Sequence, residues 1–388
     1  MAPKGSAHPH HGFIDFQSFL SDYPNLTKHV QELRLCGFGM NDVRWTSVCC
    51  HDVVNLLSQL PALRDLTFAW IRFNGCSSEC SDRPPLPDPI RLRRLSFVPQ
   101  NQSSLPSHAI EVLRLFGHIQ RFIVQSFGIF QPDVSVAKDA HLRLQVQSLT
   151  ISRYDVYDFS SSFLDIIRAT PSMMSIATVV ATCSTIAHFH SVARFLGELG
   201  PRLERLSLNV TRITHGDGDD TPDWTTPHLA LCSQLQDLSM KMVLRGVPDP
   251  GEDLDVVDHP SEYTTRDSGG VMGILAATSR CHNIQRISVR VHFRSRYHLH
   301  NKELHKETLQ KRVNWPKLRL LLGAYPALRR VTFDLVDGAD DRLQQCLPVI
   351  QYELLALHQS GVLDVRLIQK EFASSNPAFE EEAWPEYA

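Results

Sequence analysis

The chain has 388 residues, of which 43% are hydrophobic and 21% charged, and its formal net charge is −3 at pH 7. This balance is ordinary for a soluble globular protein and predicts no general attraction to nucleic acid or to an anionic membrane. Nine scattered cysteines and an N-terminus without an apolar leader favour an intracellular protein, cytoplasmic or nuclear, over a secreted disulfide framework.

The chain opens on a segment without periodic pattern and then repeats one phrase. We predict that residues 1–15 (MAPKGSAHPHHGFID) are disordered. Between residues 16 and 372 the phrase L-x-x-L-x-L recurs, with any aliphatic residue or Phe at the L positions and most starts about 27–33 residues apart. Its eleven occurrences are VQELRL (30–35), LRDLTF (63–68), LRRLSF (92–97), IQRFIV (119–124), VQSLTI (146–151), IATVVA (176–181), LERLSL (203–208), LQDLSM (235–240), IQRISV (284–289), LRRVTF (328–333) and VLDVRL (362–367).

Each phrase predicts a short β-strand with one buried face, because its aliphatic positions alternate with polar ones. In LERLSL, for example, Leu206 and Leu208 are expected to point into the core, whereas Arg205 and Ser207 face solvent. A doubly wound or barrel α/β fold is the competing interpretation. Strands buried on both faces would be continuous apolar runs, which disfavours it.

Helical patterns lie between the phrases, in chain order at VVNLLSQL (53–60), HAIEVLRLF (108–116), residues 189–199 and residues 346–357. Strand plus helix at this period resembles the leucine-rich repeat. The resemblance implies an α/β solenoid of about eleven degenerate strand–helix units, with a parallel sheet on its concave face.

Two long insertions and a tail depart from the regular spacing. The acidic segment 245–270 and the basic segment 290–312 are predicted loop insertions, either solvated or in contact with a partner. Residues 373–388 are a predicted acidic C-terminal tail.

The segment FQSFLSDYPNLTKHVQELRLCGFG (16–39) resembles the entry into the repeat region of fungal F-box/leucine-rich-repeat proteins. In that family an F-box binds a Skp-type adaptor of an SCF ubiquitin ligase, and the repeats select the substrate. The resemblance implies a non-enzymatic protein-interaction module like the substrate receptor of a ubiquitin ligase. Residues 1–15 lack the L-P-x-E-type phrase of an F-box, so a Skp-type adaptor is expected only if an F-box lies upstream. The alternatives are a repeat scaffold or inhibitor without a ubiquitin link and an enzyme on an α/β fold.

The third position of each phrase supplies the predicted partner-binding residues. Arginine recurs there, and its planar guanidinium suits carboxylate or phosphate groups. We therefore expect an acidic or phosphorylated protein segment as the partner, unless these charges merely keep an exposed strand face soluble. The predicted residues are Asp65, Arg94, Arg121, Arg205, Asp237, Arg286 and Arg330.

No motif predicts catalysis, a cofactor or a metal. The sequence has no phosphate-binding glycine loop of the G-x-x-x-x-G-K-[ST] type, no G-x-S-x-G and no H-E-x-x-H. Cys76 and Cys80, the acidic turn 215–224 and the histidines at 188–190 and 298–305 each lack a complete ligand set.

Overall fold

Eleven parallel strands form one sheet in the computed structural model, and they follow one another across it in chain order. Two further short strands, β2 (Ser47–Cys49) and β4 (Arg72–Asn74), pair in a separate sheet. The large sheet contains β1 (Glu32–Cys36), β3 (Asp65–Ala69), β5 (Ile90–Val98), β6 (Phe116–Gln125), β7 (Gln145–Ser152), β8 (Thr178–Thr182), β9 (Arg205–Asn209), β10 (Asp237–Arg245), β11 (Arg286–Arg294), β12 (Arg330–Val336) and β13 (Leu363–Ile368). The structure describes residues 9–36, 47–69, 71–74, 89–98, 106–125, 142–152, 160–211, 213, 224, 226–245, 260–294, 304–336 and 343–368.

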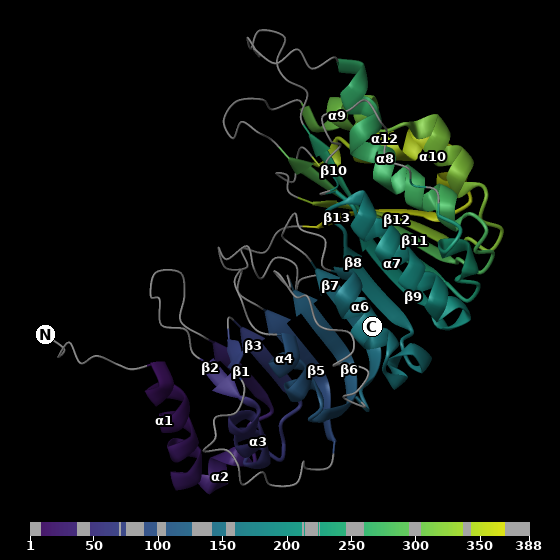
Figure 1. Ribbon diagram of the computed structural model, residues 1–388. Helices are drawn as coiled ribbons and strands as arrows, with labels where there is room; N and C mark the ends of the chain where they lie inside the picture. The colour runs from purple at the N-terminus through teal and green to yellow at the C-terminus, as the bar shows by residue number, and fades with distance from the viewer. Residues whose placement is uncertain are drawn as a thin grey trace, which may run out of the picture. The chain divides into compact units, whose positions relative to one another are not determined.

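The chain divides into two compact units, Met1–Val180 and Ala181–Ala388. The helices of the first unit are α1 (Pro9–Asp22), α2 (Pro24–Thr27), α3 (Cys50–Ser58), α4 (Pro106–Leu113), α6 (Ser160–Arg168) and the 3-10 turn η2 (Pro171–Met174). Those of the second are α7 (Ile186–Leu199), η3 (Gly200–Arg202), η4 (Leu229–Leu231), α8 (Pro260–Thr278), α9 (Leu304–Arg312), α10 (Trp315–Leu322), α12 (Leu347–Glu353) and α13 (Leu355–Gln359). Within each unit the larger helices lie against one face of the strands (Figure 1).

The aliphatic positions of the phrase form the core between strands and helices. In LERLSL the side chains of Leu203, Leu206 and Leu208 are at most 2% exposed. All three positions are buried in every phrase from LRDLTF (63–68) to IQRISV (284–289). The first and last phrases are half-exposed, because each has a neighbouring strand on one side only. The predicted inward register of the strands is therefore confirmed.

The phrases also align with one another across the sheet. The third position of one phrase lies opposite the third position of the next, as in Asp65 and Arg94 or Asp237 and Arg286. At several strand pairs one backbone carbonyl accepts two N–H groups of the next phrase; the carbonyl of Gln285, for example, accepts those of Arg329 and Arg330, at 2.8 and 3.1 Å. The register changes at the last strand, where β13 is displaced by two residues so that Thr332 lies opposite Asp364.

Buried polar side chains join consecutive repeats of the second unit on the helix side. Each lies three residues before a phrase, and its side chain donates a hydrogen bond to a backbone carbonyl in the helical segment of the preceding repeat. Cys232 donates to Leu196 at 3.5 Å, Cys281 to Leu229 at 3.1 Å and Tyr325 to Leu275 at 2.7 Å. Burial raises the pKa of Cys232 to about 12 and that of Cys281 to about 11, so both thiols stay neutral donors at pH 7.

Replacing Tyr325 with phenylalanine is expected to lower the free energy of unfolding by about 1–2 kcal/mol. The Tyr325 hydroxyl lies 2.8 Å from the hydroxyl of Thr278 and donates to the carbonyl of Leu275. Its loss therefore leaves these buried polar groups without a hydrogen-bond partner that they have in the wild type. Tyr352→Phe is the matched control, since Tyr352 is 76% exposed. Urea denaturation midpoints that are the same for the two variants would contradict this role.

The segments predicted to be irregular are partly regular. Helix α1 begins at Pro9, inside the segment 1–15 that was expected to be disordered. Residues 260–270 form the first part of α8, β11 extends to Arg294, and α9 covers residues 304–312. The strand continues because Val291 and Phe293 maintain the alternation of buried side chains beyond the phrase. Residues 246–259, 295–303 and the predicted acidic tail 373–388 lie outside the described residues.

Candidate functional site

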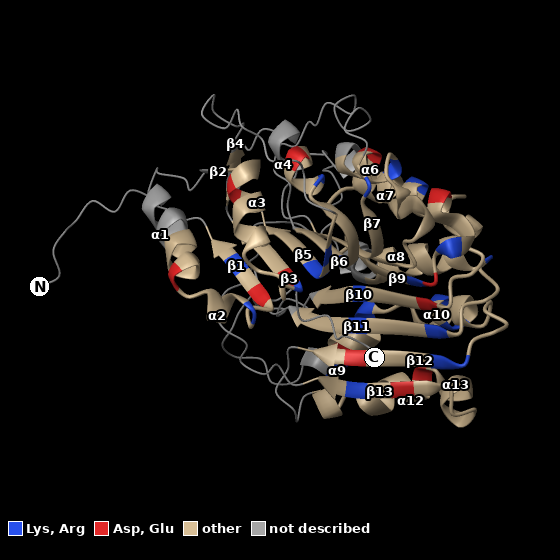
Figure 2. Cartoon of the chain, turned by 90° about the horizontal axis from the view of Figure 1, so that it is seen from below, with Lys and Arg blue, Asp and Glu red and all other residues tan. Residues whose placement is uncertain are grey.

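The polar side chains of the strands lie on the face that the helices do not cover. Because alternate residues of a strand point to opposite faces, the third and fifth phrase positions share one face. We call it the polar face. In the second unit its third-position row is Arg205, Asp237, Arg286 and Arg330, and its fifth-position row is Ser207, Ser239, Ser288 and Thr332, followed by Asp364. The charged residues of the third-position row are the first residues of β9 to β12, and further charged residues lie along the strands (Figure 2).

Asp237 lies between two arginines of the third-position row. The Oδ2 atom of Asp237 accepts a hydrogen bond from Nη2 of Arg286 at 2.6 Å, and its distance to Nε of Arg205 is 3.6 Å. The hydrogen bond to Asp237 raises the pKa of the Arg286 guanidinium. One carboxylate thus serves two guanidinium groups, and one positive charge remains uncompensated in this group of three.

Asp364 repeats this arrangement at the last strands. Its Oδ2 atom lies 2.5 Å from Nη2 of Arg330 and 2.8 Å from Nη2 of Arg366. Partial burial alone would raise the pKa of Asp364, but the hydrogen bonds from Arg330 and Arg366 outweigh it and hold that pKa below its ordinary value. Here too a single carboxylate faces two guanidinium groups.

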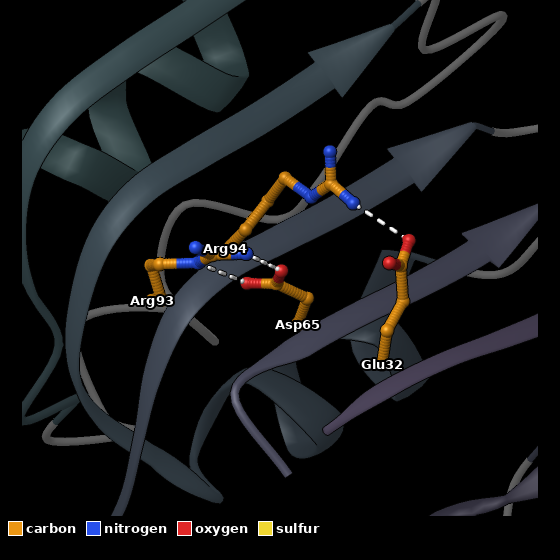
Figure 3. Close-up of polar contacts among 4 residues, drawn as sticks. All are labelled: Glu32, Asp65, Arg93 and Arg94. Carbon is orange, nitrogen blue, oxygen red and sulfur yellow. Dashed lines mark hydrogen bonds and ion pairs between the residues drawn. The ribbon is translucent and has the colours of Figure 1, made fainter. Parts of the chain in front are cut away.

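In the first unit the charges are paired more completely (Figure 3). Arg94 on β5 donates to the carboxylate of Glu32 on β1 at 2.8 Å. Asp65 on β3, between these strands, is only 2% exposed. It accepts two hydrogen bonds from Arg93, one of them from Nε at 3.0 Å. The bond from Arg93, opposed by partial burial, lowers the pKa of Asp65.

The structure brings the predicted partner-binding residues onto one face within each unit but changes what most of them can do. Arg94, Arg205, Arg286 and Arg330 all form ion pairs. The expectation that Asp65 faces solvent is wrong: the residue is buried against Arg93. The remaining two are half-buried: Arg121 on β6, opposite Arg94 and Ser148, and Asp237 on β10.

The fifth position also departs from expectation, because five of its residues are buried. The residues concerned are Thr67, Ser96, Ile123, Ser207 and Thr332. The hydroxyls of Ser96 and Ser207 have no hydrogen-bond partner among the described residues. The prediction that Ser207 faces solvent is therefore wrong, and the polar face is solvated mainly along its third-position row.

Sequence reasoning did not select the residues that pair with the predicted arginines. They are Glu32, which pairs with Arg94, and Asp364, which pairs with Arg330. It also missed Arg93, the partner of Asp65, and Arg366, the second partner of Asp364. The sequence did indicate Glu32, because an alignment of the phrases places Glu32, Asp65 and Arg94 at the same third position of consecutive phrases. The Arg330–Asp364 pair depends on the two-residue displacement of β13, which the phrase alone does not reveal.

The other candidate sites gain no support. Cys76, Cys80, His298 and His300 lie outside the described residues, as does the acidic turn apart from Trp224. His188 is buried within α7 and His190 is half-buried. Where the structure is described, no three His, Cys, Asp or Glu side chains come together as metal ligands would. None of the helices it describes is both long and apolar enough to cross a membrane.

Comparison with known proteins leaves this geometry as the main guide to function. No protein-family model matches the chain, and no curated protein matches its sequence significantly.

Proposed function

We infer that the protein is a non-enzymatic protein-interaction module whose polar face in the second unit binds an acidic or phosphorylated segment of a partner. One observation carries the proposal: two aspartates, Asp237 and Asp364, are surrounded by four arginines. Each of these two carboxylates is therefore shared between two guanidinium groups. The side chains of Arg205, Arg286 and Arg330 are each at least half exposed, so they are accessible to a partner.

The spread of these arginines favours an extended polypeptide over a compact small molecule. They occur on four strands between β9 and β13, and neighbouring strands lie about 4.8 Å apart. The row is thus on the order of 15–20 Å long. A polypeptide segment of several residues spans that length, and guanidinium groups bind its carboxylate or phosphate groups in a bidentate manner.

The parallel repeat-like sheet agrees with the resemblance to F-box/leucine-rich-repeat proteins and supports a role as a substrate receptor of a ubiquitin ligase. A scaffold or inhibitor without a ubiquitin link uses the same face in the same way. Co-purification with a Skp-type adaptor separates these two roles: recovery of the adaptor supports the receptor, and recovery of partners without it supports the scaffold.

Charge reversal tests the face itself. The triple variant Arg205→Glu, Arg286→Glu, Arg330→Glu is expected to recover at least tenfold less of each partner than the wild-type chain in a quantitative pull-down. The neutral triple variant with glutamine at the same positions should also lose the partners, because glutamine cannot supply the positive charge. The matched control is Arg194→Glu, Arg202→Glu, Arg280→Glu, which makes the same charge change at three exposed positions outside the strands.

Circular dichroism spectra of all variants establish that the chains are folded. A partner list that is the same for the wild type, the two polar-face triples and the control would overturn the proposal. Loss of partners in the control as well would show that overall charge, not the polar face, governs capture.

A further inference from the structure

Two exposed arginines of the polar face lie on adjacent strands. Arg286 on β11 and Arg330 on β12 are direct register partners, so their backbones lie about 4.8 Å apart. Like charges placed directly opposite each other repel. Their side chains are nevertheless 60% and 51% exposed, so solvent and ligands reach both.

The carboxylates that pair with these arginines lie on the outer sides of the pair. Arg286 reaches back to Asp237 on β10, and Arg330 reaches forward to Asp364 on β13. Neither aspartate comes from β11 or β12, and each is shared with a further arginine, Arg205 or Arg366. The arginines on either side of the space above β11 and β12 therefore each share their carboxylate with another arginine.

Hydroxyl groups occupy the next positions on the same two strands. Ser288 and Thr332 are register partners and follow Arg286 and Arg330 by two residues, on the same face. Ser288 is half-exposed and Thr332 is buried beneath the surface of the face. The backbone positions of two arginines and two hydroxyl residues therefore form the corners of one small square on this face.

The corresponding pair in the first unit does not offer the same arrangement. Arg94 and Arg121 are also register partners, on β5 and β6. The side chain of Arg94 is only 30% exposed, and Glu32 pairs with it alone. The fifth position of β6 is Ile123, so the square has one hydroxyl, Ser96, instead of two.

We propose that Arg286 and Arg330 together bind one phosphate monoester of a partner segment, with the hydroxyls of Ser288 and Thr332 donating to its oxygens. A phosphate monoester carries a charge of about −1.5 to −2 and three acceptor oxygens arranged in three dimensions. It can accept from donors on opposite sides and from below at once, and its charge suits two neighbouring guanidinium groups. A carboxylate has half the charge and two oxygens in one plane, so it satisfies one arginine fork well but not both.

This inference rests on the proposed function, and its test separates the two. The full-length chain, fluorescently labelled, is applied to a peptide array in which each sequence occurs with a central phosphoserine, phosphothreonine or phosphotyrosine, with glutamate, and unmodified. Retention on phosphorylated members at least tenfold above that on their glutamate and unmodified counterparts is the expected result. Inorganic phosphate in the millimolar range should compete with this retention.

The best phosphopeptide is then titrated by fluorescence anisotropy. Arg286→Gln and Arg330→Gln should each weaken its binding at least tenfold, and Ser288→Ala about threefold, while Arg202→Gln should leave it unchanged. The unphosphorylated peptide should be insensitive to all four substitutions, which a merely structural role of the arginines does not predict.

Three outcomes overturn the phosphate proposal. Equal retention of glutamate and phosphorylated peptides would do so while leaving the acidic-segment function intact. A lack of retained phosphopeptides would do the same if partner capture still depended on the arginine triple. Phosphopeptide binding that is insensitive to Arg286→Gln and Arg330→Gln would place the phosphate elsewhere.

Discussion

Replacing Leu206 with alanine is expected to lower the free energy of unfolding by about 2–5 kcal/mol. The side chain is 2% exposed and lies at the centre of the LERLSL phrase, between the buried Leu203 and Leu208. Truncation removes its transfer free energy and leaves a cavity, because closely packed neighbours relax only partly. Urea denaturation followed by circular dichroism measures the effect.

Ser207→Ala is the internal control, one residue along the same strand. Ser207 is 8% exposed, and its hydroxyl has no hydrogen-bond partner among the described residues. Losing a buried hydroxyl without a partner costs nothing, so stability should stay within about 0.5 kcal/mol of the wild type or rise slightly. If Leu206→Ala and Ser207→Ala unfolded at comparable urea concentrations, the inward register of β9 would be contradicted.

The sequence predicted this register because the two faces of each strand differ in chemistry. Aliphatic residues at the first, fourth and sixth phrase positions must be covered by helices, and a displacement of one residue would expose all of them. Leu203, Leu206 and Leu208 accordingly lie where the alternation placed them. The third position followed from the same rule, and Arg205, Arg286 and Arg330 are exposed as expected.

The polar face was less predictable, because its side chains respond to neighbours on adjacent strands. Alternation gives Ser207 and Arg205 the same direction, yet only the longer side chain reaches solvent. Whether an arginine forms an ion pair depends on a carboxylate one or two strands away. In the pairs Arg94–Glu32, Arg286–Asp237 and Arg330–Asp364 the two residues are between 34 and 62 positions apart in the sequence. The phrase gives the position of each residue along its strand. The ion pair between Asp364 and Arg330, however, depends on the two-residue displacement of β13.

Segments 245–270 and 290–312 were misread for a related reason. Their charged composition suggested loops. Residues 304–312 nevertheless form the helix α9 (Leu304–Arg312), which buries only a few side chains, among them Thr308 and Leu309. Tertiary contacts stabilise such a helix more than its own periodicity does. Composition alone therefore underestimates regular structure where a short segment packs against an existing sheet and its helices.

Removing the guanidinium of Arg93 is expected to lower the free energy of unfolding by about 2–3 kcal/mol at pH 7, because it leaves the buried carboxylate of Asp65 without its two hydrogen bonds from Arg93. The variant is Arg93→Gln. Arg329→Gln is the matched control, because Arg329 is exposed and holds the same second position in its phrase. This substitution should lower the free energy of unfolding by less than about 0.5 kcal/mol. Urea denaturation at pH 7 gives both values, and equal midpoints would show that the Asp65–Arg93 pair contributes nothing particular.

The pH dependence distinguishes this ion pair from simple packing by Arg93. The hydrogen bond from Arg93 lowers the pKa of Asp65 in the folded chain, whereas the unfolded chain retains an ordinary value of about 3.9. A carboxyl group with a lowered pKa stabilises the fold above the unfolded pKa, and this contribution is lost as the pH falls through the folded pKa. The stability difference between the wild type and Arg93→Gln should thus be constant from pH 7 to about pH 5 and shrink below about pH 4. Thermal unfolding midpoints measured across this range should therefore converge at the acidic end for Arg93→Gln and stay parallel to the wild type for Arg329→Gln. A deficit in Arg93→Gln that persisted undiminished at pH 3 would assign its effect to packing by the arginine side chain instead of to the charge of Asp65.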